Sequence, residues 1–439
     1  MTAENNASAK KLSTESYKGV RDFYPEDMFV QKFIFERMRK AVEKFGYVEY
    51  GASVLEPAEL YRAKSGEEIV NEQTYTFTDR GEREVTLRPE MTPTVARMVA
   101  AKRRELVFPL RWYSIPNLFR YEQPQRGRTR EHWQLNVDLF GTSGIEADIE
   151  TLSVAHEVMR SFGAKDGDFE IQINNRKLWN SFYESWGVTG DVQHKLSKLI
   201  DRKNKIPKAT FEDEAKKLIP EKISDFLKAV GETDLENLPA EIKATDGFKE
   251  LSELVTRLKQ KGIGNAVYNP TIMRGFDYYT GNVFEVFDTN PENRRALFGG
   301  GRYDDLTALF GGEQIPAVGF GAGDVTIRNF LETHGLLPTY KPTAGLYIAI
   351  QDETCRESAE QLATLLRADG TDVALDISHK KLGDQIKIAD RQKVPFVTAV
   401  GAEEVKSGAY RIKNLADGTE KILKAAEISE YLKTQLVVI

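Results

Sequence analysis

The sequence is poor in cysteine, in histidine and in long hydrophobic runs. Its single cysteine, Cys355, excludes an internal disulfide and is typical of a protein from a reducing compartment. Its 5 histidines are scattered along the chain, which excludes a standard zinc site. No apolar run approaches the roughly 18 residues of a membrane helix, and the N-terminus lacks the basic and apolar segments of a secretory signal. We therefore expect a cytoplasmic protein with no membrane association.

The chain also lacks the common glycine-rich nucleotide-binding loops. There is no Walker loop and no Gly-x-Gly-x-x-Gly after a strand, so a bound nucleotide is not held in the P-loop or Rossmann manner. The 61 Lys and Arg against 67 Asp and Glu give a net charge of −6. Contact with nucleic acid would therefore depend on local basic patches and not on the overall field. The 439 residues allow about two or three domains.

The residue pattern predicts an α+β body, a helical insertion and a C-terminal α/β domain. Residues 1–16 are polar and predict a disordered tail. Residues 17–335 contain short alternating segments separated by turns, typical of antiparallel strands. Within them, residues 185–264 are rich in Lys and Glu with apolar residues at helical spacing, which predicts an inserted helical module. After a linker at 336–342, residues 343–439 alternate strand and helix, as in a βαβαβ unit with a parallel sheet.

The clearest strand covers residues 132–139. Its apolar and polar side chains alternate, and the polar face consists of His132, Gln134, Asn136 and Asp138. Such a face suits the floor of a polar pocket. The segment before it, residues 119–130, holds 4 arginines and 2 glutamines. Planar donors in a loop suit phosphates and unpaired bases, although composition alone would also fit a solvated charged hairpin.

These segments resemble the class II aminoacyl-tRNA synthetases. Residues 119–122, Phe-Arg-Tyr-Glu, together with the basic loop and the strand that follows, resemble motif 2. Residues 273–279 (Met-Arg-Gly-Phe-Asp-Tyr-Tyr) and 299–304 (Gly-Gly-Gly-Arg-Tyr-Asp) resemble the two histidine-specific signatures of the histidyl-tRNA synthetase family. Residues 86–92 resemble its glutamate-bearing segment. The C-terminal unit is similar to the family's anticodon-binding domain, so the likeness runs from about residue 17 to the C-terminus.

The resemblance implies a histidine–tRNA ligase. Such an enzyme activates histidine with ATP, which carries Mg²⁺ on its β- and γ-phosphates, releases pyrophosphate and transfers histidine to tRNA(His). It also implies a homodimer, no organic prosthetic group and no metal ligands from protein side chains. The implied catalytic residues are Arg120 and Arg274, which hold the α-phosphate from opposite sides. Preorganised donors of this kind typically contribute about 10²- to 10³-fold in rate.

The resemblance also implies the remaining site residues. Glu90, Thr92 and Gln134 would accept the ammonium group of histidine, and Asp138 and Tyr279 would bind its two ring nitrogens. Tyr278 and Tyr303 complete the implied histidine-binding set, although Tyr278 would ordinarily be explained by cross-strand packing. The implied ATP-binding residues are Arg120, Glu122, Arg128, His132 and Arg274. The implied tRNA-contacting residues are Gln125, Arg126 and Arg130.

The sequence departs from the family pattern at a few positions. Thr326 stands where motif 3 carries an arginine that packs over adenine, and His132 stands at the position of the family's stacking aromatic residue. Ser53 replaces the motif 1 proline near the expected dimer interface. Asp138 is an aspartate where many members have glutamate.

Two alternatives to a histidine–tRNA ligase follow from the same resemblance. The synthetase-like regulatory subunit of ATP phosphoribosyltransferase could lose the phosphate-binding arginines, the basic loop and the C-terminal domain, whereas this chain keeps all three. A class II synthetase for another amino acid would not need the signature at 274–279. The basic face of the insertion, around residues 202–208, fits equally well a solvated helix and a contact with tRNA phosphates.

Overall fold

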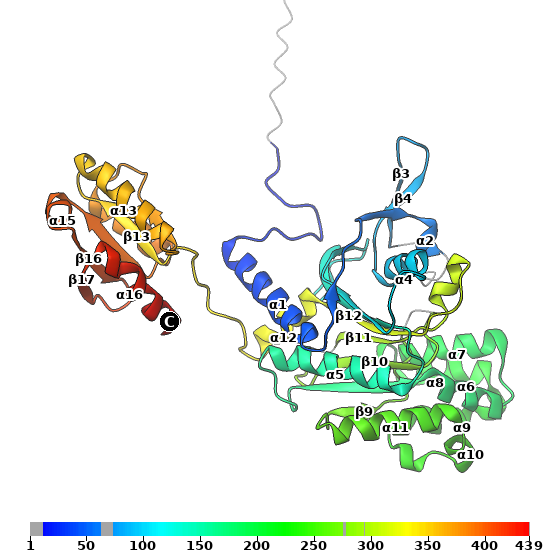
Figure 1. Ribbon diagram of the computed structural model, residues 1–439. Coiled ribbons are helices and arrows are strands. Elements are labelled where there is room, and N and C mark those ends of the chain that lie inside the picture. Colours follow the sequence, from blue (N-terminus) through cyan, green and yellow to red (C-terminus); the bar gives the residue numbers. More distant parts are fainter. Residues whose placement is uncertain (1–11, 63–72, 275–277, 294, 439) are drawn as a thin grey trace, which may run out of the picture. The chain divides into compact units, whose positions relative to one another are not determined.

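The structure is a computed structural model that describes residues 12–62, 73–274, 278–293 and 295–438 (Figure 1). Most of the predicted disordered tail, residues 1–11, lies outside these ranges, and residues 12–16 form neither helix nor strand. The chain divides into two compact units, Met1–Pro338 and Thr339–Ile439. Each unit is described by itself. In the described ranges, no helix combines the length and apolarity that crossing a membrane requires.

A largely antiparallel sheet forms the centre of the first unit. Its strand order is β1-β5-β7-β12-β11-β10-β8-β9, and β6 pairs with β7 beside this path. The pairings are antiparallel except for β1 with β5 and β8 with β9. The strands are β1 (Val48–Glu49), β5 (Leu110–Ser114), β6 (Asn117–Phe119), β7 (Glu131–Phe140), β8 (Phe169–Asn175), β9 (Ala266–Tyr268), β10 (Asn282–Asp288), β11 (Ala296–Arg302) and β12 (Ala317–Gly323). This architecture confirms the predicted α+β class.

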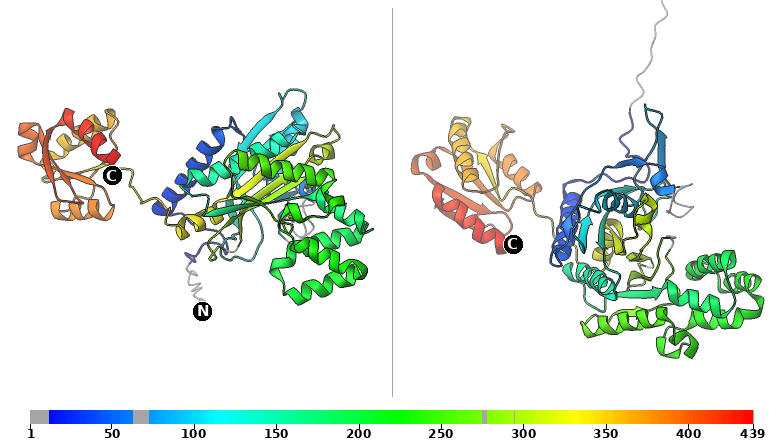
Figure 2. Two further views of the ribbon diagram at one scale, coloured as in Figure 1. Left: turned by 90° about the horizontal axis from the view of Figure 1, so that it is seen from below. Right: turned by 45° about the vertical axis from the view of Figure 1, so that its right-hand side comes forward.

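The two faces of this sheet differ in chemistry because side chains alternate along each strand. One face is apolar and packs against four helices (Figures 1 and 2): α1 (Pro25–Glu43), α5 (Ile145–Ser161), α11 (Asp246–Gln260) and α12 (Asp324–Thr333). Leu135 and Val137 of β7 point into this core, as the predicted alternation requires. The other face carries the polar side chains of β7 and several glycines, and it holds the candidate site.

A second group of elements lies before β5. It comprises α2 (Glu59–Arg62), α4 (Thr92–Lys102) and a small antiparallel sheet in the order β2-β4-β3, with β2 (Leu55–Pro57), β3 (Tyr75–Thr78) and β4 (Glu84–Leu87). Val95 and Val99 of α4 pack with Tyr278 and Tyr303 in a core on the polar side of the main sheet. This helix therefore closes one end of the candidate site.

The helical region begins with α6 at Arg176, before residue 185, from which the helical insertion is predicted. The side chain of Asn175 accepts hydrogen bonds from the backbone N–H groups of Lys177 (2.8 Å) and Leu178 (3.3 Å), which begins a helix directly after β8. Its helices are α6 (Arg176–Ser185), α7 (Gly190–Arg202), α8 (Lys208–Leu218), α9 (Ile223–Gly231), α10 (Ala240–Lys243) and α11. The aromatic side chains of α6 form their core together with Phe226.

The C-terminal unit contains the predicted parallel βαβαβ arrangement and a hairpin that was not predicted. Its sheet order is β14-β13-β15-β16-β17, in which β13 pairs in parallel with β14 and β15. The added strands β16 and β17 are antiparallel. The elements are β13 (Leu346–Ile350), α13 (Arg356–Ala368), β14 (Val373–Leu375), α14 (Leu382–Arg391), β15 (Phe396–Val400), α15 (Ala402–Ser407), β16 (Ala409–Asn414), β17 (Glu420–Lys424) and α16 (Ala425–Val438).

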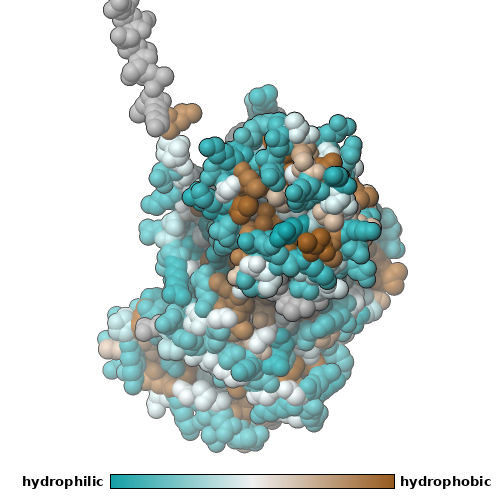
Figure 3. Space-filling model, turned by 90° about the vertical axis from the view of Figure 1, so that its left-hand side faces the viewer, coloured by the Kyte–Doolittle hydropathy of each residue, from teal (hydrophilic) through white to brown (hydrophobic). Residues whose placement is uncertain are grey.

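Hydrophilic side chains cover most of the surface that Figure 3 shows. Hydrophobic side chains appear there in small, separate groups, as on the surface of most folded domains.

Candidate active site

Glycines on two neighbouring strands form the floor of a trough on the polar face of the sheet. The register pairs Gly319, Gly321 and Gly323 of β12 with Asp138, Asn136 and Gln134 of β7, and Gly301 and Gly299 of β11 with Gly319 and Gly321. A Cβ atom at Gly321 would lie 2.2 Å from Nε2 of Gln134, and one at Gly319 would lie 2.6 Å from Oδ1 of Asp138. Only glycine therefore leaves room for both polar side chains over the floor.

A cavity of about 180 Å³ lies at the Gly321–Gly323 end of the trough. Four of the residues predicted to bind ATP line it together: Arg120, Glu122, Arg128 and His132. Gln134, which is predicted to bind the ammonium of histidine, is also in its wall. The predicted ATP and histidine sites are therefore contiguous on one surface.

Two arginines, Arg120 and Arg128, and one carboxylate, Glu122, line the cavity. Arg120 follows β6 and donates its Nε to the carbonyl of Pro89 at 2.9 Å. Its two Nη groups bond no acceptor in the described part of the chain, so they can donate to phosphate oxygens. Arg128 pairs with Glu122 at 3.3 Å. Burial and the nearby cations Arg120 and Arg21 lower the pKa of His132 to about 3, which leaves a neutral imidazole suited to stacking.

Asp138 and Tyr303 form a buried polar pair next to this cavity. Asp138 is 3 % exposed, and its Oδ1 accepts a hydrogen bond from the hydroxyl of Tyr303. Its Oδ2 is buried and has no hydrogen-bond partner within the described residues. Burial raises the pKa of Asp138 to about 7, although the Tyr303 hydrogen bond opposes that shift. A buried carboxylate with one unused oxygen is a strong acceptor for a ring N–H.

Glu90 is hydrogen-bonded to Tyr278, whose ring packs against that of Tyr303. The hydroxyl of Tyr278 donates to Oε2 of Glu90 at 3.1 Å, and both side chains are buried. Burial, and then the negative charge of Glu90, raise the pKa of Tyr278 well above its ordinary value, while a hydrogen bond with Thr92 lowers it. The rings of Tyr278 and Tyr303 are 5.8 Å apart. Tyr278 therefore both packs in the hydrophobic cluster and donates a hydrogen bond to Glu90.

Arg274 approaches the trough from the other side. Its Nη1 donates to Oε1 of Glu285 at 2.9 Å, and its guanidinium lies 5.9 Å from the ring of Tyr279. A Cβ atom at Gly299 would lie 2.8 Å from Nη1 of Arg274, and Gly299 pairs with the cavity-lining Gly321. Arg274 therefore lies against Gly299, whose paired residue Gly321 lines the same cavity as Arg120. Arg274 itself is not among the residues that line the cavity.

Two features of this arrangement were not foreseen from the sequence. Tyr303 was predicted as a histidine-binding residue, but its hydrogen bond to Asp138 was not predicted. The role of Tyr279 at the second ring nitrogen of histidine stays a prediction. Glu285, the partner of Arg274, was not among the predicted residues. Its only signal in the sequence is a carboxylate between the apolar residues of β10.

The three residues predicted to contact tRNA have different environments. Gln125 and Arg126 are exposed in the loop and contact Arg295 (2.8 Å) and Asn293 (3.4 Å). Arg130 is 8 % exposed and stacks on the ring of Tyr121 at 3.9 Å, and it also donates to the hydroxyl of Tyr17. In this structure Arg130 holds the loop against residues 17–19, so Gln125 and Arg126 are the accessible donors.

Comparison with known families agrees with this geometry. Residues 19–324 match the family model described as histidyl-tRNA synthetase, and residues 344–435 match the one described as anticodon binding domain. The chain belongs to the histidyl-tRNA synthetase family. The first match lies in the unit that carries the trough, and the second lies in the unit that carries the parallel sheet.

Relatives with assigned activities in the histidyl-tRNA synthetase family are similar over nearly their whole length. A protein of Leptospira biflexa named histidine–tRNA ligase is 41 % identical over 437 residues, covering 97 % of this chain and 99 % of the relative. Its namesake from Thermoplasma volcanium is 35 % identical over 428 residues, covering 96 % and 99 %. The regulatory-subunit alternative is less supported, because these full-length relatives bear the ligase name.

Solved structures show the same fold. The histidyl-tRNA synthetase from Nostoc sp. PCC 7120 has a TM-score of 0.83 at 23 % identity, covering 97 % of this chain and 100 % of that one. A protein from Bacillus halodurans C, described as an ATP phosphoribosyltransferase regulatory subunit/histidyl-tRNA synthetase, has a TM-score of 0.73 at 23 % identity, covering 89 % and 98 %. At this identity the likeness shows the fold alone.

The structure explains how this member of the histidyl-tRNA synthetase family accommodates its motif 3 departure. The hydroxyl of Thr326 donates to the carbonyls of Leu297 (2.5 Å) and Gly323 (3.1 Å), so its side chain lies in the cavity wall. The neighbouring Asp324 is buried and accepts hydrogen bonds from Arg21 (2.8 Å) and other donors. The N-terminal segment is thereby fixed beside the cavity, an arrangement that sequence reasoning missed.

Restoring arginine at position 326 is expected to weaken ATP binding. Gly127 of the loop lies against this residue, since a Cβ atom there would be 3.8 Å from Cγ2 of Thr326. An arginine would fill part of the cavity that Thr326 lines or press against the loop, and overpacking of this kind costs about 1–3 kcal/mol. We expect Thr326→Arg to raise the KM for ATP roughly tenfold. Thr326→Ser, which keeps the hydroxyl, is the control. A lower KM for ATP in Thr326→Arg would show that the position is open.

Proposed function

We propose that this chain activates histidine with ATP and transfers the histidyl group to tRNA(His). The observation that carries the proposal is the buried Asp138–Tyr303 pair on the same glycine floor as the cavity that Arg120 and Arg128 line. One end of the trough offers acceptors for an imidazole, and the other offers cations for a polyphosphate. Histidine and ATP are a substrate pair that needs both the acceptors for an imidazole and the cations for a polyphosphate.

The proposed histidine site uses the polar groups at the Asp138 end. The free Oδ2 of Asp138 accepts the ring N–H, and the hydroxyl of Tyr303 fixes the carboxylate. Glu90, Thr92 and Gln134 accept the ammonium group, and Tyr278 holds Glu90 in place. Tyr279 flanks the pocket beside Arg274. A site built this way rejects amino acids without a ring N–H, because its own buried polar groups would be left unpaired.

The proposed chemistry is an attack of the histidine carboxylate on the α-phosphorus of ATP. A new C(O)–O–P bond forms, the bond to the β-phosphate breaks, and pyrophosphate leaves. Arg120 and Arg274 stabilise the charge that develops on the α-phosphate from two sides. Arg128 faces the outer phosphates, which carry Mg²⁺ from solution, and Glu122 and His132 lie at the adenosine end. A ribose hydroxyl of tRNA then attacks the histidyl carbonyl, and AMP leaves.

The proposal includes the partners that this activity requires. Gln125 and Arg126 are exposed and suited to contact the acceptor end of tRNA(His), and residues 343–439 are proposed to bind its anticodon. The exposed apolar side chains of Leu55 and Phe77 on the β2-β4-β3 sheet support a homodimer. Ser53, at the motif 1 departure, accepts a hydrogen bond from the N–H of Leu55 at this edge. We propose the cytoplasm as the site of action.

Exchange of labelled pyrophosphate into ATP tests this function directly. We expect exchange that depends on histidine and is at least about 10³-fold weaker with each other amino acid. Charging of a tRNA(His) transcript, measured in parallel, should require the same amino acid.

The outcome also separates the alternatives. Exchange without amino-acid preference would contradict the assignment of histidine. Absence of exchange, together with binding to an ATP phosphoribosyltransferase, would favour the regulatory subunit.

A further inference from the structure

The end of β11 places two adjacent side chains on opposite faces of the sheet. Tyr303 extends over the trough and donates to Asp138. Arg302, the residue before it, points to the helix-covered face, where it is 5 % exposed. This alternation follows from strand geometry. Arg302, buried behind the sheet, is thus the sequence neighbour of the tyrosine that holds the proposed substrate-binding carboxylate of Asp138.

The guanidinium of Arg302 clamps the segment that follows β7. Its Nη1 donates to the carbonyl of Thr142 at 3.1 Å, and its Nη2 donates to that of Gly144 at 3.0 Å. Its Nε and Nη2 also bond the carboxylate of Asp148 on α5, which is 2 % exposed. The strand that carries Asp138 and the strand that leads to Tyr303 are therefore joined by one buried side chain.

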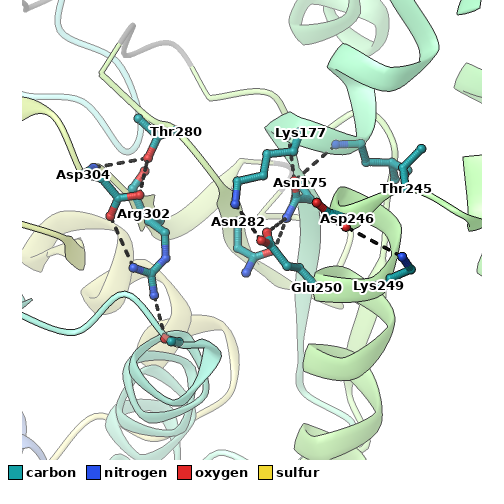
Figure 4. A network of polar contacts seen from close by, with 12 residues as sticks. Asn175, Lys177, Thr245, Asp246, Lys249, Glu250, Thr280, Asn282, Arg302 and Asp304 are labelled. Carbon is teal, nitrogen blue, oxygen red and sulfur yellow. Dashed lines mark hydrogen bonds and ion pairs between the residues drawn. The ribbon is translucent and has the colours of Figure 1, made fainter.

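The partners of Arg302 are themselves held in place. Asp304 accepts from Nη1 of Arg302 (3.3 Å) and from Oγ1 of Thr280 (3.0 Å). Asp148 also accepts from Nδ2 of Asn282 at 3.1 Å. Figure 4 shows two groups of these contacts: Arg302 with Asp304 and Thr280, and Asn282 with Asn175, Glu250 and Lys177. The hydrogen bond between Asn282 and Asp148 joins the second group to the partners of Arg302.

We infer that Arg302 is a positioning residue for the histidine pocket: it fixes the distance between the hydroxyl of Tyr303 and the carboxylate of Asp138. The donors of its rigid plane bond four groups, the carboxylates of Asp148 and Asp304 and the carbonyls of Thr142 and Gly144, so the guanidinium leaves little freedom to the two strand ends. This inference rests on the proposed function, since it assigns Tyr303 and Asp138 to histidine. Lysine keeps the charge but cannot span Asp148, Asp304 and the two carbonyls together.

The test compares Arg302→Lys with Arg111→Lys in pyrophosphate exchange. Arg111 of β5 makes a similar two-pronged pair with Glu150 of the same helix α5, at 2.6 and 2.8 Å, but it does not contact Tyr303 or Asp138. We expect Arg302→Lys to raise the KM for histidine about tenfold or more, because lysine leaves some of the buried acceptors of Arg302 unpaired and the strand end that carries Tyr303 then shifts. The KM for ATP should stay nearly unchanged. Arg111→Lys should leave both nearly unchanged.

A double-mutant cycle separates positioning from a general loss of stability. If Arg302 acts through Tyr303, the increase in the KM for histidine in Arg302→Lys combined with Tyr303→Phe should be smaller than the product of the single effects. Independent effects that multiply, or equal increases in the KM for histidine and for ATP, would overturn the inference. If Arg302→Lys does not fold, Asp304→Asn at the more exposed end of the network replaces it, with the same expectations. A wild-type protein that shows no histidine-dependent exchange would instead contradict the proposed function.

Discussion

Replacing Arg274 with alanine is expected to slow histidine activation by roughly 10²- to 10³-fold while changing histidine affinity only a few-fold. The reason is that its guanidinium lies against Gly299, where we propose that the α-phosphate binds, and does not contact Asp138 at the proposed imidazole end of the trough. Single-turnover formation of the adenylate measures the rate, and equilibrium binding measures the affinity. A loss of similar size in both would show that Arg274 anchors the substrate and does not act on the transition state.

Two further variants make this result interpretable. Arg274→Ala leaves the carboxylate of Glu285 without its 2.9 Å partner, and that charge could disturb ATP by itself. Arg274→Ala combined with Glu285→Gln should be as slow as Arg274→Ala alone if the missing guanidinium is the cause. Arg328→Ala is the control. Arg328 lies on α12 and pairs with Asp27 of α1 and with Glu332 of its own helix, so this variant should keep nearly full activity.

Asp138→Asn should abolish most of the activity with histidine and at the same time stabilise the protein at high pH. Asparagine can still accept the hydrogen bond of Tyr303, but its NH₂ group replaces the free carboxylate oxygen and cannot accept the ring N–H. We expect kcat/KM for histidine to fall at least about 10²-fold. Asp288→Asn is the matched control, since Asp288 is a buried aspartate of β10 that bonds His334 at 2.8 Å. It should leave kcat/KM for histidine nearly unchanged.

The effect on stability follows from the pKa of Asp138. That pKa is about 7 in the folded protein, because of burial, and roughly 3.9 in an unfolded chain. Between these values the folded state binds more protons than the unfolded state, so the contribution of Asp138 to stability is lost as the pH rises from about 4 to about 7. Asparagine does not titrate. Asp138→Asn should therefore gain up to about 4 kcal/mol in the free energy of unfolding near pH 8.

Two measurements check the role of this carboxylate. Denaturant unfolding of both proteins across this pH range should show the difference growing with pH, and a difference that is constant with pH would contradict the raised pKa. In the wild type, kcat/KM for histidine should increase as the pH rises through about 7, because the ionised carboxylate is the proposed acceptor of the ring N–H. In Asp138→Asn, only the titration of histidine itself, near pH 6.5, should remain.

Local sequence patterns were sufficient to predict the strands and helices in which apolar and polar residues alternate regularly. The alternation in β7 predicted that Gln134 and Asp138 share a face, and both lie over the glycine floor. The start of helix α6 at Arg176 was not predicted because it depends on one cap, the side chain of Asn175, within a segment whose composition does not change. The hairpin β16–β17 was missed because its charged, weakly alternating residues fit a loop as well as an edge strand.

The sequence by itself determined the family, the α+β class, the parallel core of the C-terminal unit and the types of residues that a histidine and ATP site needs. Those follow from local spacing and from short motifs. Only the tertiary structure decided which groups meet. Tyr303 bonds Asp138 across 165 positions of the chain, and Arg302 bonds Asp148 across 154. Such pairs depend on the order and register of the strands, which bring distant segments together and which no local pattern encodes.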